Sequence, residues 1–306
     1  MKKIIFLLST LSLASSISLA KENIPTVEES KIFEKNPILK VTNIGQYLEI
    51  DNTSGAEDIG ENVHFANYVG LAYGDNWTFD FMARKTWSMD TDDGVHSKNH
   101  RIDLDAWRNF ENFSLGFRFR NEEDFDRYYL RTKYQYGLFS GWIDGAYQSN
   151  NGAIDSEDAY YLETMPVTLT IGPVTLGYYF EADTWSVNTI DDKTSIDKAG
   201  FKHDYRQQLR LSSPIYKGDK LNIGFEYRWQ FDTDTEYDMK YRTEGYDEIK
   251  NNHIFILSAG YDITENLNIN GYYQYEIRDY DRKGDNNPAH NDDYYGEFFI
   301  GWNYKF

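Results

Sequence analysis

From about Leu39 to its last residue, the chain alternates apolar and polar side chains with a period of two. The segments 221–231 (LNIGFEYRWQF) and 113–120 (FSLGFRFR) follow this pattern most clearly. Because successive side chains of a strand point to opposite sides, each segment predicts a strand with one apolar and one polar face. We therefore expect an all-β protein.

The length of the segments separates two kinds of β protein. A soluble β-sandwich also alternates, with its apolar face turned inward. Soluble strands average about 5–6 residues, whereas a tilted strand that crosses a membrane needs about 9–11. The segments of this chain run to about 10–13 residues, which favours a membrane-spanning barrel.

The links between the segments fall into two classes. Tight turns occur at 74–76, 111–112, 171–173 and 264–266, and longer acidic links at 51–61, 90–99, 149–158, 184–200, 232–251 and 281–292. Short turns on one side and long loops on the other are typical of outer-membrane barrels. The expected strands are 39–50, 62–73, 77–89, 100–110, 113–121, 125–136, 139–148, 159–170, 174–183, 201–212, 221–231, 252–263, 267–280 and 293–306. We predict a transmembrane antiparallel up-and-down β-barrel of about 14 strands over residues 39–306.

The N-terminus carries an export signal. Lys2 and Lys3 precede an apolar run at 4–8 and a small-residue end at 18–20, which is typical of a cleaved signal peptide over residues 1–20. The apolar run is short for a spanning helix, which needs about 20 residues. Residues 21–38 show no period and are expected to form a periplasmic N-terminal segment. These features predict the outer membrane of a Gram-negative bacterium.

Composition agrees with an exported β protein. A net charge of -19 with a mean hydropathy of -0.69 would by itself suggest disorder. The aromatic content of 17% argues for β-structure instead. The absence of cysteine excludes a disulfide framework, and a closed barrel needs none because closure pairs every strand edge.

The chain ends in EFFIGWNYKF, an alternating segment that finishes on an aromatic residue. This ending resembles the C-terminal signal by which outer-membrane barrels are recognised for insertion, so the barrel-assembly machinery is an expected partner. Its lipid-facing stripe would end at the membrane interface. The residues of this assembly signal are Phe298, Ile300, Trp302, Tyr304 and Phe306.

The polar face carries many charges. Buried charges without partners are very costly, so an interior this charged implies water. Fourteen strands lie between the filled eight-stranded barrel and the open sixteen-stranded porin, which leaves room for a channel. An excess of arginine over residues 84–133 would raise the local anion concentration, although any single residue could equally belong to a structural salt bridge. The expected pore-lining residues are Arg84, Arg101, Asp103, Arg118, Arg120, Arg127, Arg131, Lys133, Arg206, Arg210, Glu226, Arg228, Glu276 and Arg278.

The acidic link 232–251 resembles a calcium loop only faintly, because the required Gly and terminal Glu are missing. A solvated loop is the favoured interpretation, and the sequence predicts no metal site and no cofactor. The six histidines form no catalytic motif, and no HExxH, GxSxG or phosphate-binding loop is present. We expect no catalytic residue and no enzymatic activity.

The fourteen expected strands and the terminal GWNYKF resemble the monomeric outer-membrane porin G family. That resemblance implies a wide, weakly selective pore, gated by a flexible loop between strands eleven and twelve. The segment 232–251 takes this place, and its expected gating residues are Asp232, Asp234, Glu236, Asp238 and Gly245. His253 fits one position of the family's pH-sensing histidine pair, but 267–280 contains no histidine. The oligogalacturonate-specific porins, with an arginine-lined lumen, are a neighbouring resemblance.

The sequence thus predicts a passive diffusion channel for small hydrophilic solutes and ions. An acidic-oligosaccharide-selective channel and a non-conducting barrel adhesin are the alternatives. A monomer is expected, because the third outer link is only about 121–124 and every strand offers a lipid-compatible face. The other expected partners are outer-membrane lipid, lipopolysaccharide and small polar solutes, without nucleic acid.

Overall fold

A computed structural model describes residues 38–54, 60–90, 94–150, 158–185, 200–239, 242, 244–285, 287–289 and 293–306. The expected signal peptide at 1–20 and, apart from Ile38, the expected periplasmic segment at 21–38 lie outside the described residues. Within these ranges, no helix is long and apolar enough to cross a membrane.

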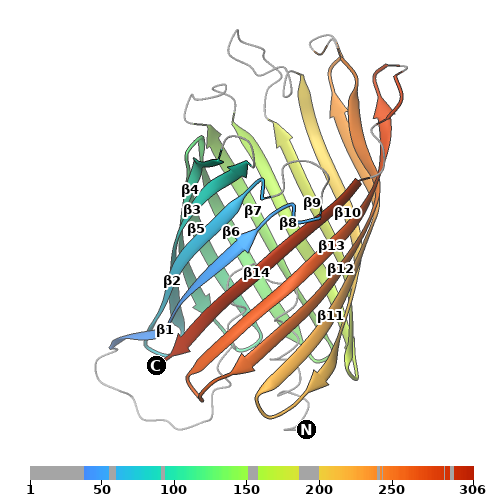
Figure 1. The fold of residues 1–306 in the computed structure, drawn as a ribbon. Helices are drawn as coiled ribbons and strands as arrows, with labels where there is room; N and C mark the ends of the chain where they lie inside the picture. Colours follow the sequence, from blue (N-terminus) through green and yellow to red (C-terminus); the bar gives the residue numbers. More distant parts are fainter. Residues whose placement is uncertain are drawn as a thin grey trace.

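The described residues form fourteen antiparallel strands that close into one barrel (Figure 1). Each strand pairs with its neighbours in sequence, and β1 closes the barrel by pairing with β14. The prediction of an all-β, 14-stranded barrel is confirmed. The strands are β1 (Leu39–Ile50), β2 (Val63–Tyr73), β3 (Trp77–Asp90), β4 (Gly94–Asn109), β5 (Phe113–Glu122), β6 (Phe125–Tyr136), β7 (Phe139–Asn150), β8 (Ala159–Ile171), β9 (Val174–Trp185), β10 (Phe201–Lys217), β11 (Leu221–Tyr237), β12 (Tyr246–Asp262), β13 (Leu267–Lys283) and β14 (Asp293–Lys305).

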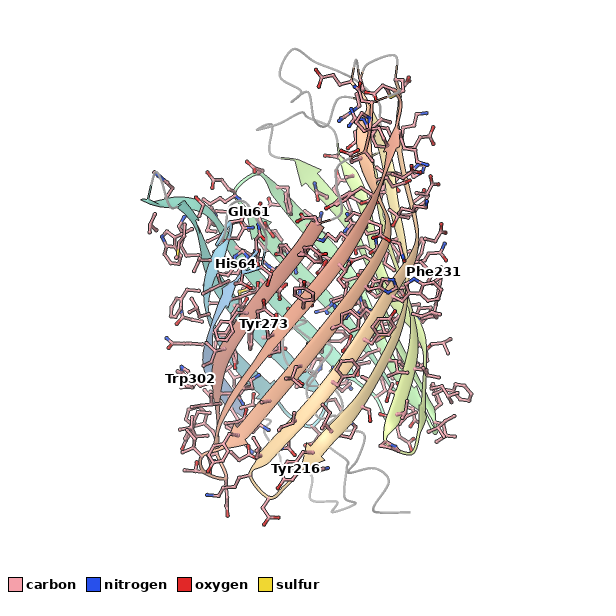
Figure 2. All side chains as sticks on the ribbon, turned by 45° about the vertical axis from the view of Figure 1, so that its right-hand side comes forward. Glu61, His64, Tyr216, Phe231, Tyr273 and Trp302 are labelled. Carbon is pink, nitrogen blue, oxygen red and sulfur yellow. The ribbon has the colours of Figure 1, made fainter. Side chains whose placement is uncertain are left out.

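The barrel is apolar outside and polar inside, the reverse of a soluble protein. Exposed large apolar side chains occur on every one of the fourteen strands, and Figure 2 shows side chains covering the outer wall. Buried positions are instead rich in charged and amide side chains, of which Asp103 and Glu226 are only 1% exposed. The alternation therefore sorts apolar residues to the outer face and charged residues to the lumen.

The closing strand presents the expected assembly signal on the outer face. Leu48 of β1 lies opposite Ile300, and Gln46 lies opposite Trp302, whose indole donates a hydrogen bond to the Gln46 amide oxygen (3.2 Å). Phe298, Ile300 and Tyr304 are exposed. A β-bulge between Val41 and Asn43 shifts the alternation of β1 by one residue.

The expected gating loop is shorter than 232–251, and this correction comes from the lengths of β11 and β12. β11 continues to Tyr237 because β10 begins at Phe201 and pairs with it along that length. Asp232, Asp234 and Glu236 therefore lie on a strand, and the connection comprises 238–245. A β-bulge at Phe231, where Gln207 pairs with Asp232 and Gln208 with Gln230, turns these three acids to the outer face.

Above the bulge, β11 and β12 separate. Their ladder ends at Gln230 and Asn252, after which β11 pairs with β10 and β12 pairs with β13. Side chains bridge the gap: the Thr235 amide donates to Glu248 Oε1 (2.6 Å), and the Tyr246 hydroxyl donates to the Thr235 carbonyl (2.8 Å). The upper ends of the pairs β10–β11 and β12–β13 therefore project separately, and these two hydrogen bonds join them.

Adjacent positions of β12 test the assignment of the two faces. Leu257 is 54% exposed on the outer face, whereas Ser258 faces the lumen and donates to the Gly224 carbonyl (3.3 Å). Leu257→Arg is expected to reduce the free energy of folding into lipid vesicles by about 2 kcal/mol or more, because the charge would lie in hydrocarbon. Ser258→Arg, the control, is expected to fold like the unchanged chain. Urea titrations of both variants in vesicles measure the difference, and equal losses would contradict the assigned faces.

Candidate functional site: the lumen wall

The densest charge cluster of the lumen lies on β4–β7. Arg101 and Arg120 both donate to Asp103, from Arg101 Nη2 (2.5 Å) and from Arg120 Nε (2.9 Å). Asp103 lies directly opposite Arg120 in the β4–β5 register, so this pair is set by the backbone ladder. Arg118 approaches the same carboxylate to 3.9 Å. One aspartate therefore neutralises part of the charge of three guanidinium groups.

Asp105 continues the network toward β6 and β7. It accepts from Arg118 Nε (2.8 Å) and from Arg131 Nη1 (2.5 Å). Arg131 also reaches Asp144 on β7 (2.8 Å), its directly opposed residue. The result is a continuous chain of four arginines and three aspartates across four strands. The salt-bridge alternative considered for single lumen arginines therefore applies to this whole group.

Aromatic rings support the cations on this wall. Arg131 and Lys133 lie over the Trp107 ring, at 4.8 and 4.4 Å from its centroid. Arg127 lies 4.4 Å from the Tyr161 centroid and donates to the Gln148 amide oxygen (2.5 Å). Cation–π contact favours a fixed position for each guanidinium group.

These lumen aromatics are site residues that the sequence prediction missed. Trp107, Tyr129, Tyr161 and Tyr179 interrupt the polar face of their strands, and Arg120 lies 5.2 Å from the Tyr129 centroid. An aromatic residue at a polar position of the alternation was the available signal.

A carboxylate pair lies on β8 and β9. Glu163 and Glu181 are directly opposed across the two strands. Tyr161 donates to both carboxylates (3.2 and 3.1 Å), and Tyr179 does the same (3.1 and 3.0 Å). Arg210 from β10 covers the Tyr179 ring at 3.6 Å. Each phenol has a single proton, so the two tyrosines supply two donors that the two carboxyl groups share.

The remaining predicted lumen arginines are paired locally. Arg228, Arg278 and Arg206 each contact an acid two positions earlier on their own strand, at 2.5, 2.9 and 2.5 Å. Their partners are Glu226, Glu276 and Asp204. Each of these three arginines is therefore neutralised within its own strand, whereas Arg210 of β10 donates to the Gln208 amide oxygen (3.0 Å). Arg84 of β3 lies directly opposite Arg101 of β4, beside the β4–β7 network.

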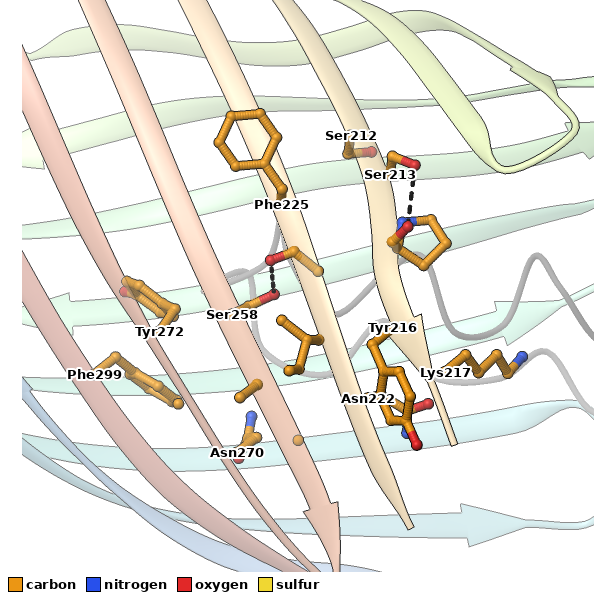
Figure 3. Close-up of a pocket in the computed structure, with 16 residues that line it drawn as sticks. Ser212, Ser213, Tyr216, Lys217, Asn222, Phe225, Ser258, Asn270, Tyr272 and Phe299 are labelled. Carbon is orange, nitrogen blue, oxygen red and sulfur yellow. Dashed lines mark hydrogen bonds between the residues drawn. The ribbon is translucent and has the colours of Figure 1, made fainter. Parts of the chain in front are cut away.

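The wall is lined by smaller side chains near the tight turns of β10–β14. Figure 3 shows a pocket bounded there by Ser212, Asn222, Ser258 and Asn270, with Tyr272 and Phe299 on one side. The rings of Tyr272 and Phe299 stack with their centroids 5.0 Å apart. Small polar residues leave space along this part of the wall.

The expected gating residues make contacts of their own. Asp232 accepts from the Gln207 amide (2.5 Å), Asp234 lies 3.3 Å from His203, and Glu236 accepts from Lys202 (2.6 Å). All three contacts are on the outer face. Asp238 donates its amide to the Gly200 carbonyl (2.7 Å).

Gly245 donates its amide to Asp285 Oδ2 (2.9 Å), in the connection after β13. Arg282 hydrogen-bonds the same carboxylate and holds the pKa of Asp285 below its ordinary range. Asp285 therefore stays ionised. It tethers Gly245, at the end of the connection 238–245, to the connection that follows β13.

His253 does not face the lumen. It lies opposite Trp229 on the outer face, and its Nδ1 is 2.7 Å from the Tyr227 hydroxyl. Its side chain is therefore separated from the lumen by the barrel wall.

Comparisons with known proteins give low similarities. No family model matches the chain, and no curated protein matches it. Among solved structures, the outer membrane protein OmpT of Vibrio cholerae is 12% identical with a TM-score of 0.46, covering 88% of this chain and 98% of that one. The anion-selective porin from Comamonas acidovorans is 11% identical with a TM-score of 0.44, covering 88% and 100%. The channel DcaP of Acinetobacter baumannii is 8% identical with a TM-score of 0.46, covering 89% and 98%. None of these likenesses assigns a function to this chain.

The shared aspartate of the network is expected to matter for stability. The Asp105 side chain is 2% exposed and pairs with both Arg118 and Arg131. Asp105→Asn would remove the negative charge that these two guanidinium groups share. Breaking a buried ion pair costs about 3–5 kcal/mol, and water in the lumen places this one at the lower end, about 3 kcal/mol. The matched control is Asp204→Asn, because its partner Arg206 is 42% exposed. Urea unfolding in detergent measures both, and equal effects would contradict a structural role for the network.

Proposed function

We propose that this chain is an outer-membrane channel for the passive diffusion of small hydrophilic solutes and ions. The observation that carries the proposal is the closed barrel whose inner face holds the Arg–Asp network while its outer face is apolar. Ionised side chains inside a barrel need water, since desolvating them is very costly. Water inside and hydrocarbon outside describe a pore.

The proposed location and state follow from the same features. The apolar outer face on all fourteen strands fits a bilayer around the whole circumference, so we propose a monomer. The export signal and the C-terminal assembly signal support insertion into the bacterial outer membrane through the barrel-assembly machinery, among lipid and lipopolysaccharide. We propose kinship with the porin G family from the strand number and the C-terminal motif.

Selectivity is proposed to lean weakly toward anions. The β4–β7 network contains four arginines and three aspartates, and Arg127 and Lys133 add two cations beside it. The aspartates cancel three of these six positive charges, so the surplus is half of what a count of cations alone suggests. A residual positive field in a confined lumen still raises the local anion concentration.

A second candidate is a channel for acidic oligosaccharides. Guanidinium groups beside aromatic rings suit a ligand that carries carboxylates on sugar rings, and Arg127 lies between Phe125 (4.7 Å) and Tyr161 (4.4 Å). Addition of oligogalacturonate to a conducting pore separates the candidates: concentration-dependent block supports a specific channel, and unchanged current supports a general one.

Reversal potentials in planar bilayers test the proposed pore with two opposite variants. The first variant replaces four arginines with serine: Arg118, Arg120, Arg127 and Arg131. The matched variant replaces their acidic partners with asparagine: Asp103, Asp105 and Asp144. The first is expected to shift ion preference toward cations and the second toward anions, because each removes one sign of fixed charge. Both shifts should shrink as salt rises, since the Debye length falls from about 10 Å at 0.1 M to 3 Å at 1 M.

Both variants are first checked for heat-modifiable migration, which reports a folded barrel. Unchanged ion preference at low salt in two folded variants would mean that these residues lie outside the conducting path. A folded, unchanged chain that gives no channel currents would favour the adhesin alternative.

The shortened connection between β11 and β12 is proposed to gate the pore. It lies at the long-loop end of the barrel, and Gly245 at its end is tethered to Asp285 in the connection after β13. Deleting residues 239–244 is expected to lengthen open times and reduce current flicker in single-channel recordings. Deleting residues 151–157, in a different outer connection, is the control and should leave the flicker unchanged. Equal flicker in the unchanged chain and the 239–244 deletion would contradict gating by this connection.

A further inference from the structure

A histidine and two carboxylates meet at the long-loop end of β1 and β2. They are Glu49 near the end of β1, Asp51 just after it, and His64 near the start of β2. Figure 2 places His64 and Glu61 toward the same upper rim of the barrel. The lumen-channel proposal uses none of these three residues.

The three side chains converge on one point. His64 Nε2 lies 3.3 Å from Asp51 Oδ2 and 3.7 Å from Glu49 Oε1, and one ligand atom from each residue lies within 4.8 Å of the others. Zinc takes nitrogen and oxygen ligands at about 2.0–2.2 Å, so two ligands of a tetrahedral ion lie roughly 3.3–3.5 Å apart. The two histidine–carboxylate separations bracket that value within a few tenths of an ångström.

The other nitrogen of His64 is held by a separate partner. Nδ1 lies 2.8 Å from the Thr86 hydroxyl on β3, and both side chains are buried. Metal-binding histidines are commonly fixed in this way, since a hydrogen bond at one nitrogen orients the other toward the ion. Thr86 thus directs Nε2 toward the two carboxylates.

Glu49 provides an independent observation. Its side chain is only 8% exposed, and its Oε2 is buried with no hydrogen-bond partner among the described residues. A buried carboxylate oxygen without a partner is costly, and a bound cation would satisfy it. The Asn62 amide donates to Asp51 Oδ2 (3.1 Å), the same oxygen that faces His64, and so fixes the position of this carboxylate.

The surroundings favour a divalent cation. His64 and Thr86 line a cavity of about 380 Å³ that gives solvent access to the cluster. The charged residues of this cavity balance as two cations and two anions: Arg84, Lys98, Glu123 and Asp124. The lining of this cavity therefore supplies no net positive charge to offset Glu49 and Asp51, whose carboxyl groups both face His64.

We propose that Glu49, Asp51 and His64 bind one divalent transition-metal ion of the zinc class. Histidine nitrogen with carboxylate oxygen suits Zn²⁺ better than Ca²⁺, which prefers oxygen ligands alone. The bound ion ties Asp51, at the base of the first long connection, to the barrel wall. It also removes two negative charges at the long-loop mouth of the lumen.

His203 offers a matched control on the same protein. It also faces two acids, Asp234 at 3.3 Å and Glu236 at 3.8 Å. However, its Nε2 faces one acid and its Nδ1 the other, so the two carboxylates lie on different sides of the ring and cannot share an ion with one nitrogen. The acids are also 68% and 49% exposed. His203→Gln is therefore expected to leave zinc binding intact.

Isothermal titration of Zn²⁺ into the refolded, tag-free chain tests the proposal, with Ca²⁺ titrated in parallel. We expect one Zn²⁺ per chain, unchanged affinity in His203→Gln, and an affinity about tenfold lower in the isosteric Thr86→Val, whose hydroxyl only orients His64. His64→Gln and Glu49→Gln are expected to lose more than Thr86→Val. Heat-modifiable migration confirms that each titrated variant is folded.

Three results would overturn the site: no zinc binding by the folded chain, wild-type affinity in His64→Gln, or Ca²⁺ binding as tight as Zn²⁺. The titration requires no ion flow, so it succeeds or fails separately from the proposed channel function.

Discussion

Every backbone amide and carbonyl that enters hydrocarbon must find a partner within the protein, because no water is available there. Pairing β1 with β14 meets this requirement, since it removes the two edges that an open sheet of fourteen strands would leave. Closure also divides the side chains into two environments. The apolar outer face and the charged lumen are both consequences of one continuous ladder.

Strand number and strand faces could be predicted from the sequence because both depend on local information. A period of two fixes which residues share a face, and the contrast between tight turns and long links fixes where strands end. At a bulge the local period fails. On β11 the extra residue Phe231 turns Asp232, Asp234 and Glu236 outward. These alternating acids suggested a loop, but they lie on the outer face of β11, which continues to Tyr237 because it pairs with β10. The end of β11 therefore depends on its pairing with β10, which the period of β11 alone does not show.

The ion-pair partners in the lumen could not be predicted from the sequence, for a related reason. Alternation predicts that Arg118, Arg131 and Asp105 face inward, but their contacts depend on how three strands are aligned. A shift of one strand by two residues would preserve every face and change every ion pair between that strand and its neighbours. The cluster of Glu49, Asp51 and His64 illustrates the same limit, because it joins two strands and a turn across a long connection. His253, predicted at a family position, faces outward beside Tyr227.

Register therefore determines the electrostatics of the lumen as well as closure of the wall. Asp103 lies opposite Arg120, and Arg131 lies opposite Asp144, because the β4–β5 and β6–β7 ladders align them. Each aspartate lowers the cost of holding arginines against a low-dielectric wall and at the same time reduces the field those arginines project into the water. Stability and field strength thus act in opposition in this network: adding acids makes the wall easier to form and weakens the positive field in the lumen. The four arginines and three aspartates of the network are close to balance, so most of the positive surplus on this wall comes from Arg127 and Lys133 beside them.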